Sequence, residues 1–220
     1  AFKYIKTQAT RASERLAEDR GEAPDVSGSG RRNANLLAVA PNASSSIICG
    51  GTSPSIEPYR ANVYTHKTLS GSFQVKNKYL EELLQDKGLK KDELTAVWKD
   101  IAGNEGSVQH LDILTDEEKE LFKTANEIDQ IWIIEHASKR QEFICQAQSV
   151  NLFFTIPTAT EPQEVHDEYM QYVNDVHWYG MNKLKSLYYF RTNAARNAEN
   201  VNTKVQRIKL DDAECIACEG

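Results

Sequence analysis

The chain has 220 residues, of which 40% are hydrophobic and 26% charged, and its formal net charge is −6. This composition is ordinary for a globular protein of one or two domains. The negative charge argues against a general phosphate-backbone binder, which carries a basic face, and no apolar run approaches the roughly 20 residues that span a bilayer. We therefore expect no nucleic-acid partner and no membrane partner. The N-terminus has no signal-like apolar core. Because the chain starts at Ala1 without an initiator Met, we expect a processed or trimmed chain or a piece of a longer one.

The predicted elements alternate between helices and strands, which indicates an α/β architecture. Apolar residues recur at helical spacing over residues 2–20, with charged residues on the opposite face. This pattern predicts a helix with Gly21 as its C-cap, followed by a loop to residue 35. The apolar run 36–40, closed by Pro41, predicts a short buried strand. The later predicted elements are a strand and turn over 64–75, helices near 78–85 and 92–101, one helix from Thr115 through Trp132, a strand at 149–156, a helix after Pro162 and an aromatic extended segment at 187–190.

The serine-rich turn after Pro41 is a candidate anion site. Asn42, Ala43, Ser44, Ser45 and Ser46 follow the predicted strand and stand where a helix would begin. Free backbone N–H groups, small side chains and hydroxyls at a helix start suit an anionic ligand. The alternative is an ordinary serine N-cap without a ligand.

The adjacent pair Tyr188-Tyr189 is a candidate redox pair. Two neighbouring phenols can pass an electron and a proton between them, although aromatic residues are also common core residues of strands. In a regular strand, adjacent side chains point to opposite faces. Stacked rings would therefore require a bend or bulge near residues 187–190.

The cysteines indicate a reduced, cytoplasmic protein. Cys49 and Cys145 lie among apolar residues and are predicted to be small buried thiols. Cys215 and Cys218 form the only close pair, near the end of a polar tail. A single Cys-x-x-Cys motif cannot close a tetrahedral zinc site, and the flanking acids do not favour a thioredoxin-type thiol. A terminal dithiol of this kind suits a shuttle that exchanges electrons with a disulfide.

Long motifs in a fixed order resemble the large subunits of class I ribonucleotide reductases over nearly the whole chain. They are residues 37–48, 55–64, 69–74, 146–152, 177–180 and 184–192. The resemblance implies that residues 1–191 form the C-terminal portion of the family's ten-stranded α/β barrel. Residues 192–220 would then be a mobile tail that carries the dithiol.

The resemblance also implies the roles of the candidate residues. Asn42 to Ser46 would hold the phosphates of a ribonucleoside diphosphate. Tyr188 and Tyr189 would relay a radical, supplied by a di-iron small subunit, to a substrate-activating cysteine. Cys215 and Cys218 would reduce the active-site disulfide and be recharged by thioredoxin or glutaredoxin. The helix over about 165–184 would help form the groove for the small subunit's C-terminal tail, and this chain itself would bind no cofactor.

The family's substrate-activating cysteine, its disulfide-forming cysteines and its regulatory nucleotide site precede the phosphate loop, and no matching motif stands here. We therefore expect either a split subunit whose N-terminal part is a separate chain, which we prefer, or an excised fragment. In both cases we expect no activity without the N-terminal part. The competing interpretations are a non-enzymatic binding module with a redox-sensing tail and a zinc-dependent domain.

Overall fold

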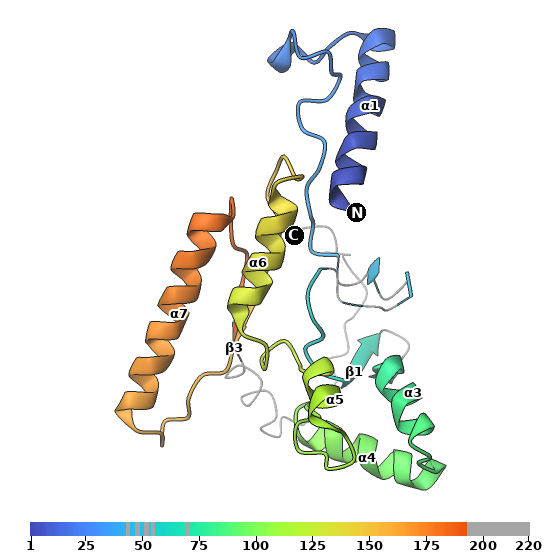
Figure 1. Cartoon of the computed structure of the whole chain (residues 1–220), viewed down its shortest axis with the longest axis vertical. Helices are drawn as coiled ribbons and strands as arrows, with labels where there is room; N and C mark the ends of the chain where they lie inside the picture. The colour runs from blue at the N-terminus through green and yellow to red at the C-terminus, as the bar shows by residue number, and fades with distance from the viewer. Residues whose placement is uncertain (43–44, 47–48, 51–52, 54–55, 69–70, 193–220) are drawn as a thin grey trace, which may run out of the picture.

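The computed structural model describes residues 1–42, 45–46, 49–50, 53, 56–68 and 71–192. Its first element is the helix α1 (Phe2–Arg20), which lies apart from the other helices (Figure 1). Gly21 ends the helix at a φ of 80°, a left-handed conformation that glycine adopts without strain, as predicted. The next loop contains the short 3-10 helix η1 (Pro24–Val26), and it is fixed to α1 where the Ser13 hydroxyl donates to Asn33 at 3.0 Å.

Extended segments from three distant parts of the chain run parallel and pair side by side. The strands β3 (Leu152–Phe154) and β4 (Phe190–Thr192) form a parallel pair, and Val39 forms a parallel bridge to Gln148 on the segment that leads into β3. Parallel strands need a long crossover, usually a helix. Here α6 (Gln130–Gln141) precedes β3, and α7 (Gln163–Lys183) connects β3 to β4.

The helices α6 and α7 pack together over these segments (Figure 1). Their shared core is built from residues of α6, the β3 region, α7 and its C-terminal cap, among them Ile134, Phe153 and Val176, which are almost fully buried. Burial of such side chains stabilises the fold by about 1.5–3 kcal/mol each. The Tyr179 hydroxyl of α7 also donates to Glu135 of α6.

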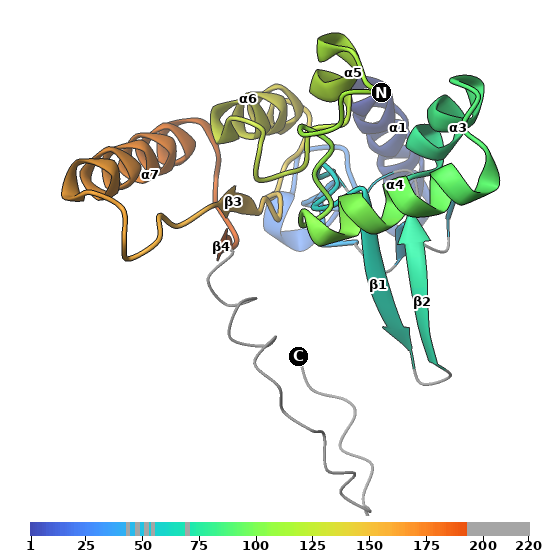
Figure 2. The ribbon, with the colours of Figure 1, turned by 90° about the horizontal axis from the view of Figure 1, so that it is seen from below.

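A second core holds the middle of the chain together. The antiparallel hairpin β1 (Val63–Thr68) and β2 (Gly71–Lys76) leads into α3 (Lys78–Asp86), α4 (Lys91–Gly103) and α5 (Asp116–Leu121). Trp98, Ile101 and Leu80 are buried at its centre. The hairpin projects from the helices (Figure 2). These bounds agree with the predicted strand and turn over 64–75 and with the predicted helices near 78–85 and 92–101.

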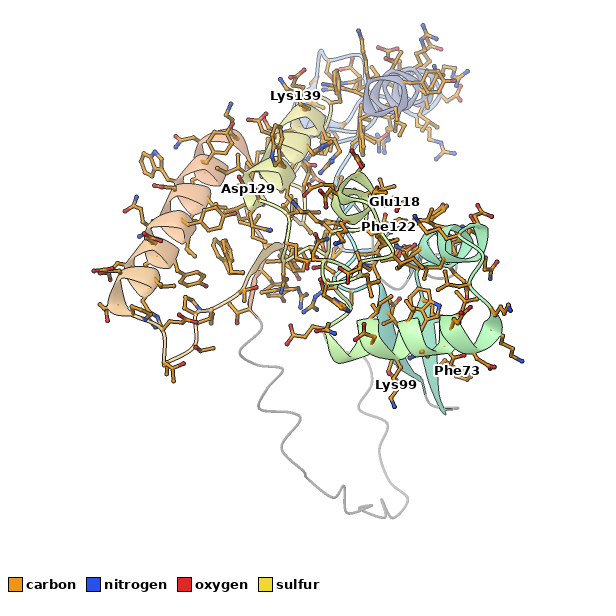
Figure 3. The ribbon with its side chains drawn as sticks, turned by 60° about the horizontal axis from the view of Figure 1, so that its bottom comes forward. Phe73, Lys99, Glu118, Phe122, Asp129 and Lys139 are labelled. Carbon is orange, nitrogen blue, oxygen red and sulfur yellow. The ribbon has the colours of Figure 1, made fainter. Side chains whose placement is uncertain are left out.

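The prediction of one helix from Thr115 through Trp132 is wrong. Thr115 does cap a helix through a capping box with Glu118, but α5 ends at Leu121 and α6 starts again after Asp129. The expected apolar face does not exist, because Leu121 is 77% and Trp132 is 64% exposed. The break is stabilised locally: the Asp129 side chain accepts from Ile131 and caps α6 (Figure 3).

Two further expectations need correction. Residues 36–40 are extended, but among them only Val39 forms a bridge. None of these residues is buried, because the face that they line is open in the part of the chain that the structure describes. Cys49 is exposed rather than buried, and Cys145 is half-buried. Among the described residues, no helix is long and apolar enough to cross a membrane.

Candidate functional site

An open concave surface of about 500 Å³ lies on the parallel segments. Its lining comes from residues 38–41 of the first segment, residues 146–149 of the second, and Ser186 and Tyr188 before β4. The surface therefore joins the end of the segment that runs into Asn42 with the first tyrosine of the candidate pair.

The serine-rich turn begins at the edge of this surface. The Ser46 amide donates to the Asn42 carbonyl and the Cys49 amide donates to the Ser45 carbonyl, both at 3.0 Å. These are bonds between residues four apart, so a helical turn starts here, as predicted. Asn42 and Ser45 are exposed and Ser46 is half-buried. Ala43 and Ser44 lie outside the described residues, so the structure gives no geometry for the whole turn.

Tyr188 and Tyr189 occupy a bulge at the start of the β4 pairing. The Tyr188 amide donates to the Val150 carbonyl at 2.9 Å, and the Leu152 amide donates to the Tyr189 carbonyl at 2.9 Å. In a regular parallel ladder, one residue would provide both of these groups. Two residues therefore oppose Asn151, which defines a β-bulge. This is the irregularity that stacked rings were predicted to require.

The bulge brings the two phenol rings together. The ring centroids of Tyr188 and Tyr189 are 4.1 Å apart, with an angle of 51° between the ring planes. The hydrogen bond between the phenols raises the pKa of Tyr188, and the charge of Arg191 opposes this effect. About half of each side chain is exposed, at 47% and 49%. The pair can therefore exchange a proton internally and still be reached from outside.

Charged residues surround this pair, although their roles were not predicted from the sequence. The guanidinium of Arg191 lies 5.1 Å from the centroid of the Tyr189 ring, and the guanidinium of Arg60 lies 5.7 Å from that of Phe153. Glu57 accepts a hydrogen bond from the Asn151 amide at 3.2 Å. The only signal for Glu57 and Arg60 was their place in the run 55–64, and the only signal for Arg191 was its place in the run 184–192, both of which resemble the family.

Desolvation raises the pKa of Glu57, although the hydrogen bonds to Asn151 and the charges of Arg191 and Arg60 act against this increase. The side-chain oxygen of Asn151 is itself buried without a hydrogen-bond partner in the described part of the chain. Glu57 and Asn151 thus form a partly desolvated polar group directly behind the bulge.

The candidate dithiol cannot be placed relative to this site, because Cys215 and Cys218 lie outside the described residues. Cys145 has a structural position instead: its sulfur accepts from the amides of Leu36 and Leu37 at 2.9 and 3.0 Å. It therefore anchors the start of the first parallel segment.

Comparison with known proteins supports the resemblance drawn from the motifs. Residues 2–190 match the model of the ribonucleotide reductase barrel domain. The chain is 42% identical over 223 residues to the ribonucleoside-diphosphate reductase large subunit of Invertebrate iridescent virus 3, and the alignment covers 100% of this chain and 34% of that protein. It is 43% identical over 219 residues to a putative large subunit of Frog virus 3 (isolate Goorha), with 100% and 36% covered.

A solved structure has the same fold. The alpha subunit of the class Id ribonucleotide reductase of Actinobacillus ureae matches with a TM-score of 0.67 and 40% identity, over 88% of this chain and 33% of that chain. The chain thus spans about a third of the length of these relatives. The predicted fold, a C-terminal portion of the family's α/β barrel, is confirmed. The chain belongs to the ribonucleotide reductase barrel-domain family.

Proposed function

We propose that this chain supplies the C-terminal portion of the large subunit of a class I ribonucleoside-diphosphate reductase. In this role it contributes the substrate-phosphate loop, the radical-relay tyrosines and the terminal dithiol. The observation that carries the proposal is the bulge, because it places the Tyr188 and Tyr189 rings 4.1 Å apart beside a concave surface that runs into the serine-rich turn.

The phosphate loop would work through the helical turn that starts at Asn42. Exposed amides and hydroxyls at a helix start are suitable donors to diphosphate oxygens, and the turn has little side-chain bulk. Asn42, Ser45 and Ser46 are the described members of the proposed set of substrate-binding residues, and Ala43 and Ser44 complete it.

The tyrosine pair would transfer a hydrogen atom equivalent between its members. A neutral tyrosyl radical at one position takes one electron and one proton from the phenol at the other, so that the first becomes a phenol and the second a neutral radical. No net charge moves, which suits a site that is only half exposed. The initial radical would come from a separate di-iron small subunit.

The dithiol of Cys215 and Cys218 would return the active-site disulfide to its reduced state by thiolate exchange. The exchange transfers two electrons and leaves a disulfide between Cys215 and Cys218. Thioredoxin or glutaredoxin would then reduce that disulfide. The substrate-activating and disulfide-forming cysteines would be provided by the N-terminal part of the large subunit, so this chain is proposed to be inactive alone.

The test is ribonucleoside-diphosphate reduction by the assembled enzyme, with this chain, the N-terminal part and the small subunit present. Tyr188→Phe and Tyr189→Phe each remove only a redox-active hydroxyl, and each is expected to abolish turnover. Tyr79→Phe is the matched control, because Tyr79 is 44% exposed and also has a cation, Lys78, over its ring, yet it lies on α3. Full turnover by the Tyr188 or Tyr189 variant would contradict the proposed relay.

A further inference from the structure

Arg191 covers the ring of Tyr189 from the same strand. Its guanidinium carbon lies 5.1 Å from the ring centroid, within the range of a cation–π interaction. The two residues are two positions apart at the start of β4, so the alternation of a strand places them on the same side. Tyr189 is therefore held between two neighbours, the Tyr188 ring at 4.1 Å and the Arg191 guanidinium.

Glu57 acts on the same site from the irregular segment that precedes β1. Its carboxylate accepts from the amide of Asn151, which is the residue opposite the bulge. This bond joins parts of the chain that are 94 residues apart. The charges of Arg191 and Arg60 both act on the carboxylate, and its half-buried position weakens solvent screening of those charges. Glu57 therefore fixes the residue opposite the bulge.

We propose that Arg191 and Glu57 are positioning residues of the tyrosine pair, Arg191 by covering the face of the Tyr189 ring and Glu57 by fixing Asn151 opposite the bulge. This inference rests on the proposed function of the pair and extends it to residues that do not exchange electrons themselves. Both side chains are proposed to act through the geometry of the two phenols.

The fixed cation has a chemical consequence for the transfer. A positive charge over the ring disfavours loss of an electron alone, because that would leave a second positive charge on the ring. Loss of the electron together with the phenolic proton leaves a neutral radical, which the cation does not oppose in this way. Arg191 therefore favours the coupled transfer, in which Tyr188–O• and Tyr189–OH become Tyr188–OH and Tyr189–O•.

The experiment compares Arg191→Gln, Arg191→Lys and Glu57→Gln in the assembled enzyme. Arg191→Gln is expected to lower kcat about tenfold with little change in KM, a size appropriate for the loss of one cation–π contact. Arg191→Lys keeps the charge but loses the planar stacking group, and we expect an intermediate kcat. Glu57→Gln is expected to lower kcat in the same direction. Lys185→Gln is the matched control. Lys185 lies three residues before Tyr188, and its ammonium group donates to the Cys145 carbonyl rather than covering a ring of the pair.

A spectroscopic measurement separates positioning from general structural support. A fluorinated tyrosine placed at position 188 reports its phenol pKa by absorbance in the same assembled enzyme. That pKa is expected to rise in Arg191→Gln, because a nearby positive charge is lost, and to stay near its original value in Arg191→Lys and Lys185→Gln.

The outcomes are distinct. If Tyr188→Phe abolishes turnover but Arg191→Gln changes neither kcat nor the phenol pKa, the inference about Arg191 is overturned and the relay stands. If Tyr188→Phe retains turnover, the proposed function itself fails. If Arg191→Gln does not fold, Arg191→Lys decides, and a kcat equal to that of the unmodified enzyme overturns the inference.

Discussion

Asn77 donates to Asn62 through both its backbone and its side chain. The backbone N–H reaches the Asn62 carbonyl at 2.8 Å, and the side-chain amide reaches the Asn62 side-chain oxygen at 2.9 Å. The side-chain amide of Asn62 in turn donates to the carbonyls of Gly106 and Phe122, at 3.1 and 2.8 Å. Both asparagines are buried. They join the start of the hairpin, the start of α3 and the segments around α5 at one point.

Replacement of Asn62 by Ala should therefore be costly. It leaves the Asn77 side-chain amide and the Phe122 carbonyl without this partner, whereas the Gly106 carbonyl keeps the bond from the backbone N–H of residue 62 at 3.0 Å. Each unsatisfied buried group costs about 1–3 kcal/mol. We expect the free energy of unfolding in urea to fall by at least about 2 kcal/mol. Asn104→Ala is the control, because that amide bonds Asp100 on the surface and its loss should cost less than about 1 kcal/mol. Equal losses for the two variants would contradict the role given to Asn62.

Gly106 should tolerate a methyl group much less well than Gly88. Both have a left-handed φ, of 84° and 86°, so alanine strains the backbone at either position. A Cβ at Gly106 would lie 2.4 Å from the Cβ of Ala61, whereas at Gly88 nothing lies within 4 Å. We expect Gly88→Ala to cost about 1 kcal/mol and Gly106→Ala at least about 2 kcal/mol more. Thermal unfolding of the two variants measures the difference, and similar midpoints would argue against the close approach of the loop to Ala61.

Tyr172 should make the stability depend on alkaline pH. Its hydroxyl donates to Asp129 at 2.9 Å and accepts from the Gln130 amide at 2.8 Å (Figure 3 labels Asp129). Burial raises the pKa of Tyr172 to about 12 from its ordinary value of 10.0. The folded state therefore binds this proton more tightly than the unfolded state. The resulting stabilisation is fully present at pH values below the ordinary pKa and is lost as the pH rises towards the pKa of Tyr172 in the folded state.

The measurement is urea unfolding of the unmodified protein and of Tyr172→Phe across that alkaline range. The difference in the free energy of unfolding between the two proteins should shrink as the pH rises. The unmodified protein loses the contribution of the phenol, whereas the variant has no such contribution. Tyr79→Phe removes a phenol that is 44% exposed and serves as the control for the loss of a tyrosine hydroxyl as such. A constant difference for Tyr172→Phe would mean that this phenol does not titrate as described.

The terminal dithiol should be needed for continuous turnover with a protein reductant. In the assembled enzyme, the double change Cys215→Ser and Cys218→Ser is expected to abolish thioredoxin-driven reduction but to preserve a small burst from enzyme that starts reduced. A small dithiol that reaches the active-site disulfide directly should restore part of the activity. Cys49→Ser is the control, because that exposed thiol has no role in the proposed exchange. Unchanged thioredoxin-driven turnover by the double variant would contradict the shuttle.

The elements with strong local signals could be predicted from the sequence. Gly21 ends α1, Thr115 starts α5 and Pro162 precedes α7, because each of these signals acts through the adjacent backbone. The wrongly predicted helix from Thr115 to Trp132 shows where such local signals fail. Its apolar residues fit a helical period by chance across a break. The break depends on contacts such as those of the Glu127 carboxylate with Thr124, which periodicity does not detect.

The candidate site was only partly predictable for a related reason. The residue types of the serine-rich turn and the tyrosine pair carry chemistry in themselves, and strand geometry alone predicted that stacked rings would need a bend or a bulge. The contribution of Glu57 and Arg191 depends on which segments become neighbours in space. The bond between Glu57 and Asn151 crosses 94 residues, and no local pattern specifies it.

The bulge also makes the length of the segment before β4 critical. One residue fewer between α7 and Phe190 would restore a regular ladder, and the single residue left opposite Asn151 could present only one phenol to that side. A substitution in this segment changes a single contact, but a deletion changes which face of the strand the preceding side chains point to. Evolution of this part of the chain is therefore expected to accept many substitutions near Tyr188 and Tyr189 and to reject single-residue changes in length.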